Sequence, residues 1–481
     1  MKRRRLRPHA LRPLLLLLPF VVLPARSAPP LSLPGAGNEI RTCDLSTAIS
    51  LALKNSRALA DSRLQQQVAR AVHRLACRQF FPSLEVGISR DDSVVYGSPD
   101  TRSRRLSLGM QQLLYDGGRT RASLKRRDRE IALAGLNLEM ESEELIFSVI
   151  TVYTEILEFR QKKKIRQDSY QSALLQKRIA AEELRLGALT ELEFLDFTIR
   201  LKDLELDLEE TEQEERLLGF RFGRLLGLKA GVPPPVPAGR LNINYSGFLG
   251  EQDDRVWLDR ALQRNADLRR AAFRLREQDE LLRQAACGWL PDVRGSFTAF
   301  ASGREYPLTE PGFEAGVELS FRLPVLPLQA AAEVGGTGSG ERSLAASTSA
   351  GVMENLEELY SKKLASLQVN RAAGDLEELR TEIDFKIREL LFNIKSGKKR
   401  LQLLRERLES GNRQRVLQKL KLQLGEIKRI DFLDAELELA KRRIDLVDAT
   451  VALYNSEVSL LRLCGRPGLA ETHRYIVIPE D

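Results

Sequence analysis

The clearest pattern in the chain is an apolar stripe along its last long segment. The apolar residues of this stripe are three or four positions apart, which places them on one face of a helix. This spacing is typical of the a and d positions of a coiled coil. We expect these side chains to pack long helices against one another. The stripe recurs in steps of three and four residues, at Ile430, Leu433, Leu437, Ala440, Ile444, Val447, Val451, Tyr454, Val458 and Leu461.

Other segments predict helices of unusual length. Residues 119–186 contain no proline and one glycine, which allows one helix of about 100 Å. Helices this long with narrow apolar stripes do not form a compact globule, so we expect a mainly α-helical protein with a small β part. The stripe spacing recurs in this segment and in a later one, at Leu145, Val149, Val152, Ile156, Leu376, Leu379 and Ile383.

A pattern of period two predicts four strands. In each strand, apolar residues alternate with polar residues or glycine, which is typical of a strand with one apolar face. The pattern is strongest in the second half of the chain, where it continues for about eleven residues. The four strands are expected at residues 84–88, 106–110, 293–299 and 313–323.

The order of these elements occurs twice, which indicates an internal duplication. Pro82 recurs as Pro291, 209 residues later, and Gly187 recurs as Gly425, 238 residues later. Two collinear offsets predict two repeats, each with the order helix, strand, strand and long helical hairpin. The first helix of each repeat is expected to end at its proline, which cannot continue a helix. These helices are expected at residues 46–81 and 256–290.

The repeats divide the chain into segments. Each repeat carries a hairpin tip, at Gly187 in the first and at Gly425 in the second. Residues 329–352, rich in Gly, Ala and Ser, are interpreted as a flexible insertion before the last long helical hairpin. The other boundaries are repeat 1 at 28–228, a proline-rich linker at 229–250, repeat 2 at 251–466 and a C-terminal tail at 467–481.

The first residues predict a secretory signal peptide. Residues 1–7 are basic, a short apolar core follows, and Ala25-Arg26-Ser27 supplies small residues before a cleavage point. The apolar core is too short for a membrane span of about 20 residues. We therefore predict a signal peptide at 1–27 and no transmembrane helix in the mature protein.

Charge and composition exclude several classes of function. The formal net charge is +8, but residues 1–27 hold seven basic residues and no acidic one. The remainder is nearly neutral, so no nucleic-acid partner is expected. Three histidines and four scattered cysteines do not suit a zinc cluster. We find no nucleophile motif or phosphate loop, so we expect no enzyme, cofactor or metal. Whether Cys43 and Cys464 pair stays open.

The predicted strands fit two kinds of protein, an outer-membrane barrel and a soluble protein. Secreted strands of this length with one apolar face suit an outer-membrane barrel. Four strands cannot close a barrel, and an open sheet edge in lipid leaves backbone groups unpaired. If these strands enter a bilayer, the chain must oligomerise, and three copies supply twelve strands. A soluble alternative fits the same strands, namely a small β-meander that caps a helical bundle.

Five passages of the sequence resemble the TolC-like outer-membrane efflux protein family. Residues 45–55 resemble the opening helix of the family, and residues 81–84 resemble its corner from helix to strand. Residues 112–119 resemble its turn from strand to helix. The segments 186–196 and 424–435 resemble its paired helical tips. The duplication is also a family trait.

The resemblance implies a fold and a function. It implies a homotrimer in which a 12-stranded β-barrel in the outer membrane joins a 12-helix coiled-coil α-barrel in the periplasm. Such a channel-tunnel is the exit duct for efflux or secretion by a tripartite pump. The implied partners are a periplasmic adaptor (membrane fusion) protein, an inner-membrane transporter and outer-membrane lipid. The alternative is a soluble periplasmic coiled-coil adaptor or scaffold protein. The cargo, the pump and the resting state stay open.

Two acidic residues are candidates for a periplasmic gate. Asp431 and Asp434 are three residues apart after the second tip, so both lie on one helix face. Threefold symmetry would gather six carboxylates, which favour cations. The resemblance assigns both to the family's gate aspartates and Glu193 to the matching acid of repeat 1. Ile427 stands at the family's gate arginine, with Arg429 or Lys428 as the candidate substitute. Alternatively, the aspartates are solvated acids at a helix start.

The remaining candidate sites are the two hairpin tips and the turn from strand to helix at 116–118. Exposed apolar residues at a helical turn are suited to docking of another protein. At Asp116, Gly117 and Gly118, glycine allows the positive φ that turns a strand directly into a helix. The candidate adaptor contacts are Arg185, Leu186, Gly187, Ala188, Leu189, Leu424, Gly425, Glu426 and Ile427.

Overall fold

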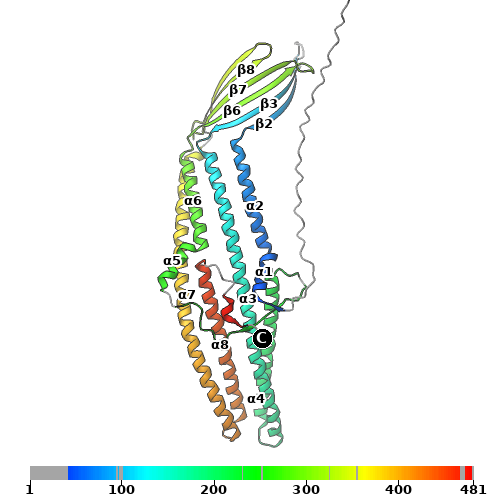
Figure 1. Ribbon diagram of the computed structural model, residues 1–481, viewed down its shortest axis with the longest axis vertical. Coiled ribbons are helices and arrows are strands. Elements are labelled where there is room, and N and C mark those ends of the chain that lie inside the picture. The colour runs from blue at the N-terminus through cyan, green and yellow to red at the C-terminus, as the bar shows by residue number, and fades with distance from the viewer. Residues whose placement is uncertain are drawn as a thin grey trace, which may run out of the picture. The chain divides into compact units, whose positions relative to one another are not determined.

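The structure is a computed structural model of the chain (Figure 1). It describes residues 42–93, 96, 101–229, 231–250, 253–323, 325–353, 356–465 and 472–478. The signal peptide expected at 1–27 lies outside these residues. In the part that is described, no helix is both long enough and apolar enough to span a membrane.

The helices of the two halves have matching lengths. In the first half they are α1 (Leu45–Asn55), α2 (Arg57–Cys77), α3 (Arg119–Arg185) and α4 (Glu191–Leu225). In the second half they are α5 (Asp254–Arg264), α6 (Ala266–Ala286), α7 (Glu357–Gln423) and α8 (Arg429–Leu463). The lengths are 11, 21, 67 and 35 residues in both halves. The prediction of one long helix over 119–186 is confirmed by α3.

The opening helix of each half is divided, so the prediction of single helices over 46–81 and 256–290 was wrong. Ser56 lies in an extended conformation between α1 and α2 and accepts a hydrogen bond from the Leu59 N–H. Asn265 lies in the same way between α5 and α6 and accepts from the Leu268 N–H. Both residues are favoured at helix N-termini, where the side chain satisfies a free donor. The short 3-10 helix η1 (Arg78–Phe80) follows α2.

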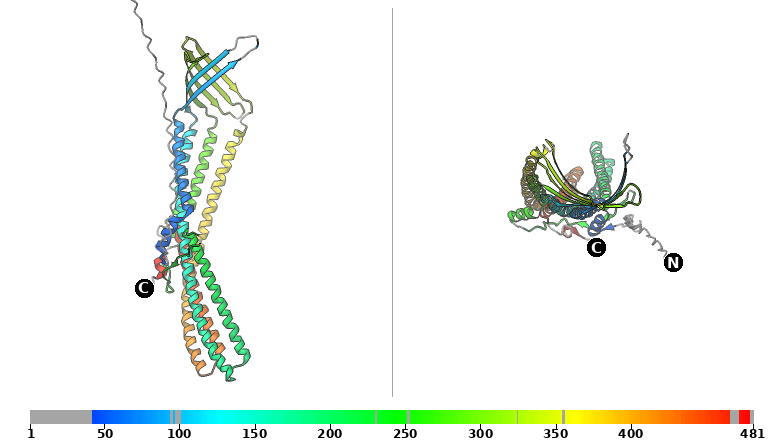
Figure 2. Two further views of the ribbon diagram at one scale, coloured as in Figure 1. Left: turned by 90° about the vertical axis from the view of Figure 1, so that its right-hand side faces the viewer. Right: turned by 90° about the horizontal axis from the view of Figure 1, so that it is seen from above.

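One antiparallel sheet lies at the end of α2, α3, α6 and α7 (Figures 1 and 2). Its strands pair in the order β2-β3-β6-β7-β8-β9. Seen from above, the strands form an open arc (Figure 2). The strands are β2 (Ser83–Ser93), β3 (Thr101–Tyr115), β6 (Asp292–Gly303), β7 (Glu310–Phe321), β8 (Leu328–Thr337) and β9 (Arg342–Ala350).

The sheet corrects two expectations from the sequence. Residues 329–352 are not a flexible insertion, because residues 328–350 form the hairpin of β8 and β9, paired from Leu328–Ala350 to Gly336–Arg342. The sheet therefore has six strands rather than four, and three copies contain eighteen strands rather than twelve. The hairpin was missed because Ala and Ser give its alternation little contrast in hydrophobicity, although small residues fit a pleated surface when neighbouring strands supply the pairing.

The two faces of the sheet differ in polarity. Directly paired residues lie on one face, so Ile88, Leu106 and Ala301 share a face across three strands. The apolar face is open to solvent in the single chain: Ile88 is 74% exposed and Leu344, on β9, is 79% exposed. On the opposite face, Arg105 and Glu314 form an ion pair of 2.7 Å between β3 and β7.

The apolar stripe of the last long segment is core, as expected. Val447, Val451, Tyr454 and Val458 on α8 are at most 3% exposed. They belong to one large cluster with Val149, Val152 and Ile156 of α3 and with Leu376 and Ile383 of α7. The stripes therefore hold the long helices of both halves together.

The linker and the C-terminal tail pack against the middle of the helices. β1 (Thr42–Cys43) pairs in parallel with β4 (Val236–Pro237), and β5 (Arg240–Leu241) pairs with β10 (Val477–Ile478), which follows α9 (His473–Ile476). Cys43 and Cys464 are both buried thiols and form no disulfide with each other.

A buried glutamate fixes the linker to α8. The Glu457 side chain is fully buried and accepts hydrogen bonds from the Tyr245 hydroxyl and from the N–H groups of Phe248 (3.1 Å) and Leu249 (3.4 Å). The Lys398 ammonium donates to the Leu249 carbonyl at 2.7 Å and lies 3.9 Å from Glu457. Burial raises the pKa of Glu457, while these hydrogen bonds act against the rise.

Replacing Glu457 is expected to destabilise the protein strongly. Glu457→Ala leaves the Tyr245 hydroxyl and two N–H groups buried without an acceptor, which should lower the free energy of unfolding by about 3 kcal/mol. Guanidinium denaturation followed by the helical circular dichroism signal measures this loss. The control is Glu438→Ala, because Glu438 forms an exposed pair with Arg442 on the same helix. Equal midpoints for the two variants would contradict the structural role of Glu457.

Candidate functional site: the paired helical tips

Each long hairpin reverses at a glycine. α3 ends at Arg185 and α4 begins at Glu191, while α7 ends at Gln423 and α8 begins at Arg429. Gly187 has φ +79° and Gly425 has φ +74°. Such left-handed residues end helices because the next N–H can bond back to a helix carbonyl. The Ala188 N–H donates to the backbone carbonyl of Glu183 at 2.8 Å, and the Glu426 N–H donates to the backbone carbonyl of Lys421 at 2.9 Å.

The candidate adaptor contacts are mostly exposed at these turns. Leu186 is 72% exposed and Leu424 is 66% exposed. Leu189 and Ile427 are half-buried, and the other predicted contacts are exposed. Leu186 and Leu424 are thus two large apolar side chains that are exposed at the turns and contribute little to the core of the single chain.

Ion pairs join the two tips within one chain. The Lys428 ammonium lies 2.8 Å from the Glu193 carboxylate, which connects the second tip to α4. The Arg429 guanidinium donates to Glu183 at 3.1 Å and to Gln176 at 2.8 Å, both on α3. The structure therefore brings Glu193 and Arg429 of the predicted gate to the same region, but each binds a different partner.

The two predicted gate aspartates also have partners within the chain. Both side chains are exposed. Asp431 accepts a hydrogen bond from the Lys428 N–H at 3.3 Å, which caps the start of α8. Asp434 forms an ion pair with Arg200 of α4. Arg429, the predicted substitute for the gate arginine, contacts neither aspartate by an ion pair among the described residues.

Sequence reasoning missed the partners Arg200, Glu183 and Gln176. Arg200 lies seven residues after Glu193, two helical turns along the same face of α4. This spacing was a usable signal. Glu183 and Gln176 give the same seven-residue signal on α3, but only the structure shows that α8 lies beside them.

The pair of Lys428 and Glu193 is charged at neutral pH. The hydrogen bonds from Lys428 and from Thr190 lower the pKa of Glu193 to about 2. The same bond to Glu193 raises the pKa of Lys428. Thr190 and Glu193 also cap the start of α4 reciprocally, since each side chain accepts from the backbone N–H of the other.

A small apolar cluster lies next to these ion pairs. Phe197 and Leu201 of α4 pack with Ala173 of α3 and Leu433 of α8, and all four are at most 7% exposed. Leu433 stands between Asp431 and Asp434 in the sequence, so the contact between hairpins combines a dry core with a charged border. The two hairpins are thus one packed unit near their tips.

The turn from strand to helix is built as expected. Gly117 and Gly118 have φ values of +67° and +85°. The Asp116 carboxylate accepts from the N–H groups of Gly118 (2.9 Å) and Thr120 (2.5 Å) and so caps α3. Burial opposes ionisation of Asp116, but these hydrogen bonds outweigh it and lower its pKa. Arg119 forms an ion pair with the buried Asp292 of β6.

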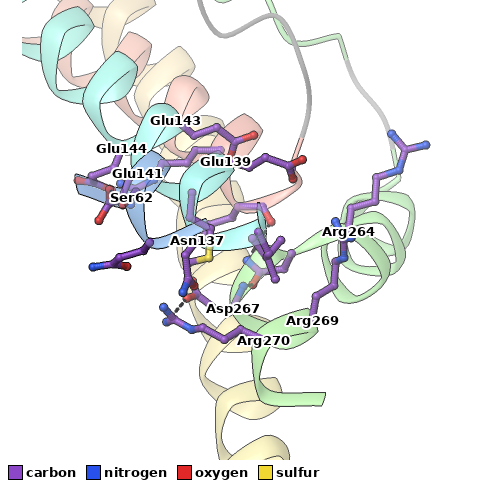
Figure 3. Close-up of a pocket in the computed structure, with 18 residues that line it drawn as sticks. Ser62, Asn137, Glu139, Glu141, Glu143, Glu144, Arg264, Asp267, Arg269 and Arg270 are labelled. Carbon is purple, nitrogen blue, oxygen red and sulfur yellow. Dashed lines mark hydrogen bonds and ion pairs between the residues drawn. The ribbon is translucent and has the colours of Figure 1, made fainter. Parts of the chain in front are cut away.

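A cavity of about 540 Å³ lies beside α3, α6 and the end of α8 (Figure 3). Glutamates of α3, among them Glu143 and Glu144, line one side, and Arg269 and Arg270 line another. Arg462 forms an ion pair with Glu144 there. Burial, together with the charge of Glu139, raises the pKa of Glu143. Within the described ranges, no group of three or more His, Cys, Asp and Glu is placed to hold a metal ion.

Comparison with known proteins agrees with this geometry. The sequence matches the family described as "Outer membrane efflux protein" over residues 48–214 and 257–466. A search of curated protein sequences found no match.

Solved structures of outer-membrane channels have a similar fold. The chain is similar to CusC, whose structures concern transmembrane channel formation, with a TM-score of 0.72 and 17% identity over 90% of this chain and 95% of that one. It is similar to the CmeC channel of Campylobacter jejuni, with a TM-score of 0.70 and 14% identity over 89% and 88%. For VceC of Vibrio cholerae the values are 0.69 and 15% over 88% and 96%.

At these low identities the structural likeness establishes the fold, while the sequence match covers most of the chain and establishes the family. Proteins of this family and the similar solved structures are channels rather than enzymes. The chain therefore belongs to the outer membrane efflux protein family, which places it in the outer membrane, and it has the fold of the solved outer-membrane channels.

Proposed function

We propose that this protein is a homotrimeric channel-tunnel that provides the exit duct of a tripartite efflux or secretion pump. The observation that carries the proposal is the amphipathic sheet with two open edges at the end of long paired helices. An apolar face of this size in a single chain needs a lipid or protein partner, and open strand edges in lipid need other strands. Oligomerisation supplies them.

The aromatic residues near the sheet support a position in a bilayer. Phe81 and Tyr115 are exposed where β2 begins and β3 ends, beside the helices. Trp289 is exposed just before β6, and Tyr306 is exposed in the turn at the far end of that strand. Aromatic side chains gather at membrane–water interfaces because their rings are apolar and their edges polar. Outer-membrane lipid is therefore the proposed surrounding of the sheet.

The helical tips are the proposed gate. In the closed state, Lys428–Glu193, Arg429–Glu183 and Arg200–Asp434 hold the second hairpin against the first. Opening separates the hairpins and breaks these pairs. Ion pairs in contact with solvent are individually weak, and Lys428 and Asp434 are exposed while Arg429 is half-buried, so a partner that binds the tips is able to shift the equilibrium. Leu186 and Leu424 are the proposed contacts for a periplasmic adaptor, which connects the duct to an inner-membrane transporter.

Extraction and mass test the proposed function first. The mature protein is expected in the membrane fraction, released only by detergent, with a native mass three times that of the chain. A folded monomer that stays soluble without detergent would contradict the duct and favour the soluble coiled-coil scaffold.

Breaking the Lys428–Glu193 pair is expected to open the tip. Above pH 4.5 Glu193 is charged whether or not it is paired, so the pair stabilises the closed state there. This contribution is lost as pH falls towards about 2, the pKa of paired Glu193. Lys428→Ala should therefore raise single-channel conductance in planar bilayers at neutral pH, and its difference from wild type should vanish as the pH approaches 2.

The control is Lys421→Ala, because Lys421 lies near the same tip and forms no ion pair among the described residues. It should leave conductance unchanged. An increase in conductance for Lys421→Ala as large as for Lys428→Ala would mean that charge alone, rather than the pair, determines closure.

The two gate aspartates are expected to make the duct selective for cations. The double variant Asp431→Ala, Asp434→Ala should show larger conductance steps and a reversal potential closer to zero in a salt gradient, because the ring of carboxylates is gone. The control is Glu406→Ala, Glu409→Ala, which removes two exposed acids with the same spacing from α7. Selectivity that is the same in both double variants would contradict the acidic gate.

The tips are expected to contact an adaptor in the cell. A photo-crosslinking amino acid at Leu186 or Leu424 should join the protein to a periplasmic adaptor that mass spectrometry identifies. The same amino acid at Leu206, which is exposed on α4 away from the tip, should not. Crosslinking to an adaptor at Leu206 alone would contradict docking at the tips.

A further inference from the structure

The hairpin of β8 and β9 continues the amphipathic wall of the sheet. Val317 on β7 pairs with Ala332 on β8, which pairs with Ala346 on β9. Residues paired in this way share a face. On the hairpin this face is mainly apolar, with Leu328, Val334, Leu344 and four alanines, and its polar members are Thr348 and Arg342. The opposite face carries Gln329, Glu333 and three serines together with Ala331 and Ala345.

The two strands are also long enough to cross a bilayer. A transmembrane strand needs about 9–11 residues, and β8 has 10 residues while β9 has 9. Their turn lies at the same end of the sheet as the turn between β6 and β7, away from the helices (Figure 1). The hairpin therefore has the length, the polarity and the direction of a wall segment.

Because β8 and β9 extend the sheet beyond β7, the open edge on this side is β9 rather than β7. β7 is paired with β8 from Gly312–Thr337 to Phe321–Leu328, which covers all but the first two residues of the strand. The open edges of the sheet are β2 on one side and β9 on the other. β2 runs away from the helices after α2, and β9 returns to them before α7. A β9 edge beside the β2 edge of a second copy is therefore antiparallel, as are all the pairs within the sheet.

We infer that β9 of one chain pairs with β2 of the next copy, so that three copies close a barrel of eighteen strands. This inference rests on the proposed trimer. At constant strand tilt, a barrel diameter grows roughly in proportion to strand number. The wall is then about 1.5 times as wide as that of a twelve-stranded barrel. Each copy supplies six strands to this barrel, while α2, α3, α6 and α7 lie directly beneath the strands (Figure 1).

Disulfide crosslinking between copies tests this pairing. The background carries Cys77→Ser and Cys287→Ser, since these two cysteines are the accessible ones. Ala346→Cys on β9 is combined in turn with Leu84→Cys, Val86→Cys or Ile88→Cys on β2, because all four lie on the apolar face. A disulfide needs Cα atoms within about 7 Å, so only a matching register reacts. One combination is expected to give a covalent trimer on a non-reducing gel.

A second probe tests the alternative of a narrower, twelve-stranded barrel that excludes β8 and β9. Phe313→Cys on β7, with the same β2 positions, is expected to stay monomeric on the gel because β8 covers that edge. In a variant that lacks residues 328–350, β7 becomes the open edge and the Phe313→Cys pair is expected to crosslink. This deletion shows that the β7 probe is able to react.

Two results would overturn the inference. Crosslinking of Phe313→Cys in the full chain would place the hairpin outside a twelve-stranded wall, and so would a native trimer in which no β9–β2 combination reacts. Both leave the proposed trimer intact. A monomeric native mass in detergent would overturn the trimer and this inference together.

Discussion

The unpaired backbone groups at the two open edges of the sheet limit how this chain is able to enter a membrane. Lipid offers no partner for an unpaired N–H or carbonyl group, and each such group costs several kcal/mol. The single chain has an exposed apolar face, with side chains such as Ile88 and Leu344 in solvent, and two open edges at β2 and β9. In the proposed trimer these edges pair and the sheet becomes a closed ring, so assembly is there a condition for membrane insertion.

The helices below the sheet meet a different requirement. Around Tyr454 and Val149 the packing is dry and extensive, and the buried Glu457 fixes the linker across it. Towards the tips the core narrows to four buried residues, bordered by exposed ion pairs such as Lys428–Glu193. Stability therefore decreases from the middle of the helices to their tips. This gradient agrees with the proposed function, in which the tips separate while the middle of the helices stays packed.

The sequence predicted those elements whose signal is local. The stripe from Ile430 to Leu461 predicted the core of α8, and the glycines of Asp116–Gly118 predicted the turn into α3. Ser56 and Asn265 were also readable as helix caps, but the continuous pattern around them hid the breaks. The hairpin of β8 and β9 was missed because its Ala and Ser residues become strands through pairing with β7. The seven-residue spacings place Arg200 on one face with Glu193, and Glu183 on one face with Gln176, but they do not show that α8 packs beside these residues, which only the structure shows.

In the proposed assembly, this chain forms a wall segment whose edges are closed by other copies. Electron cryomicroscopy of the detergent-extracted protein measures this directly, because the strands of the sheet can be counted. We expect a threefold ring in which β9 of each copy is paired with β2 of its neighbour, with no strand edge open to lipid. A single chain with both edges uncovered, or a ring that excludes β8 and β9, would contradict it.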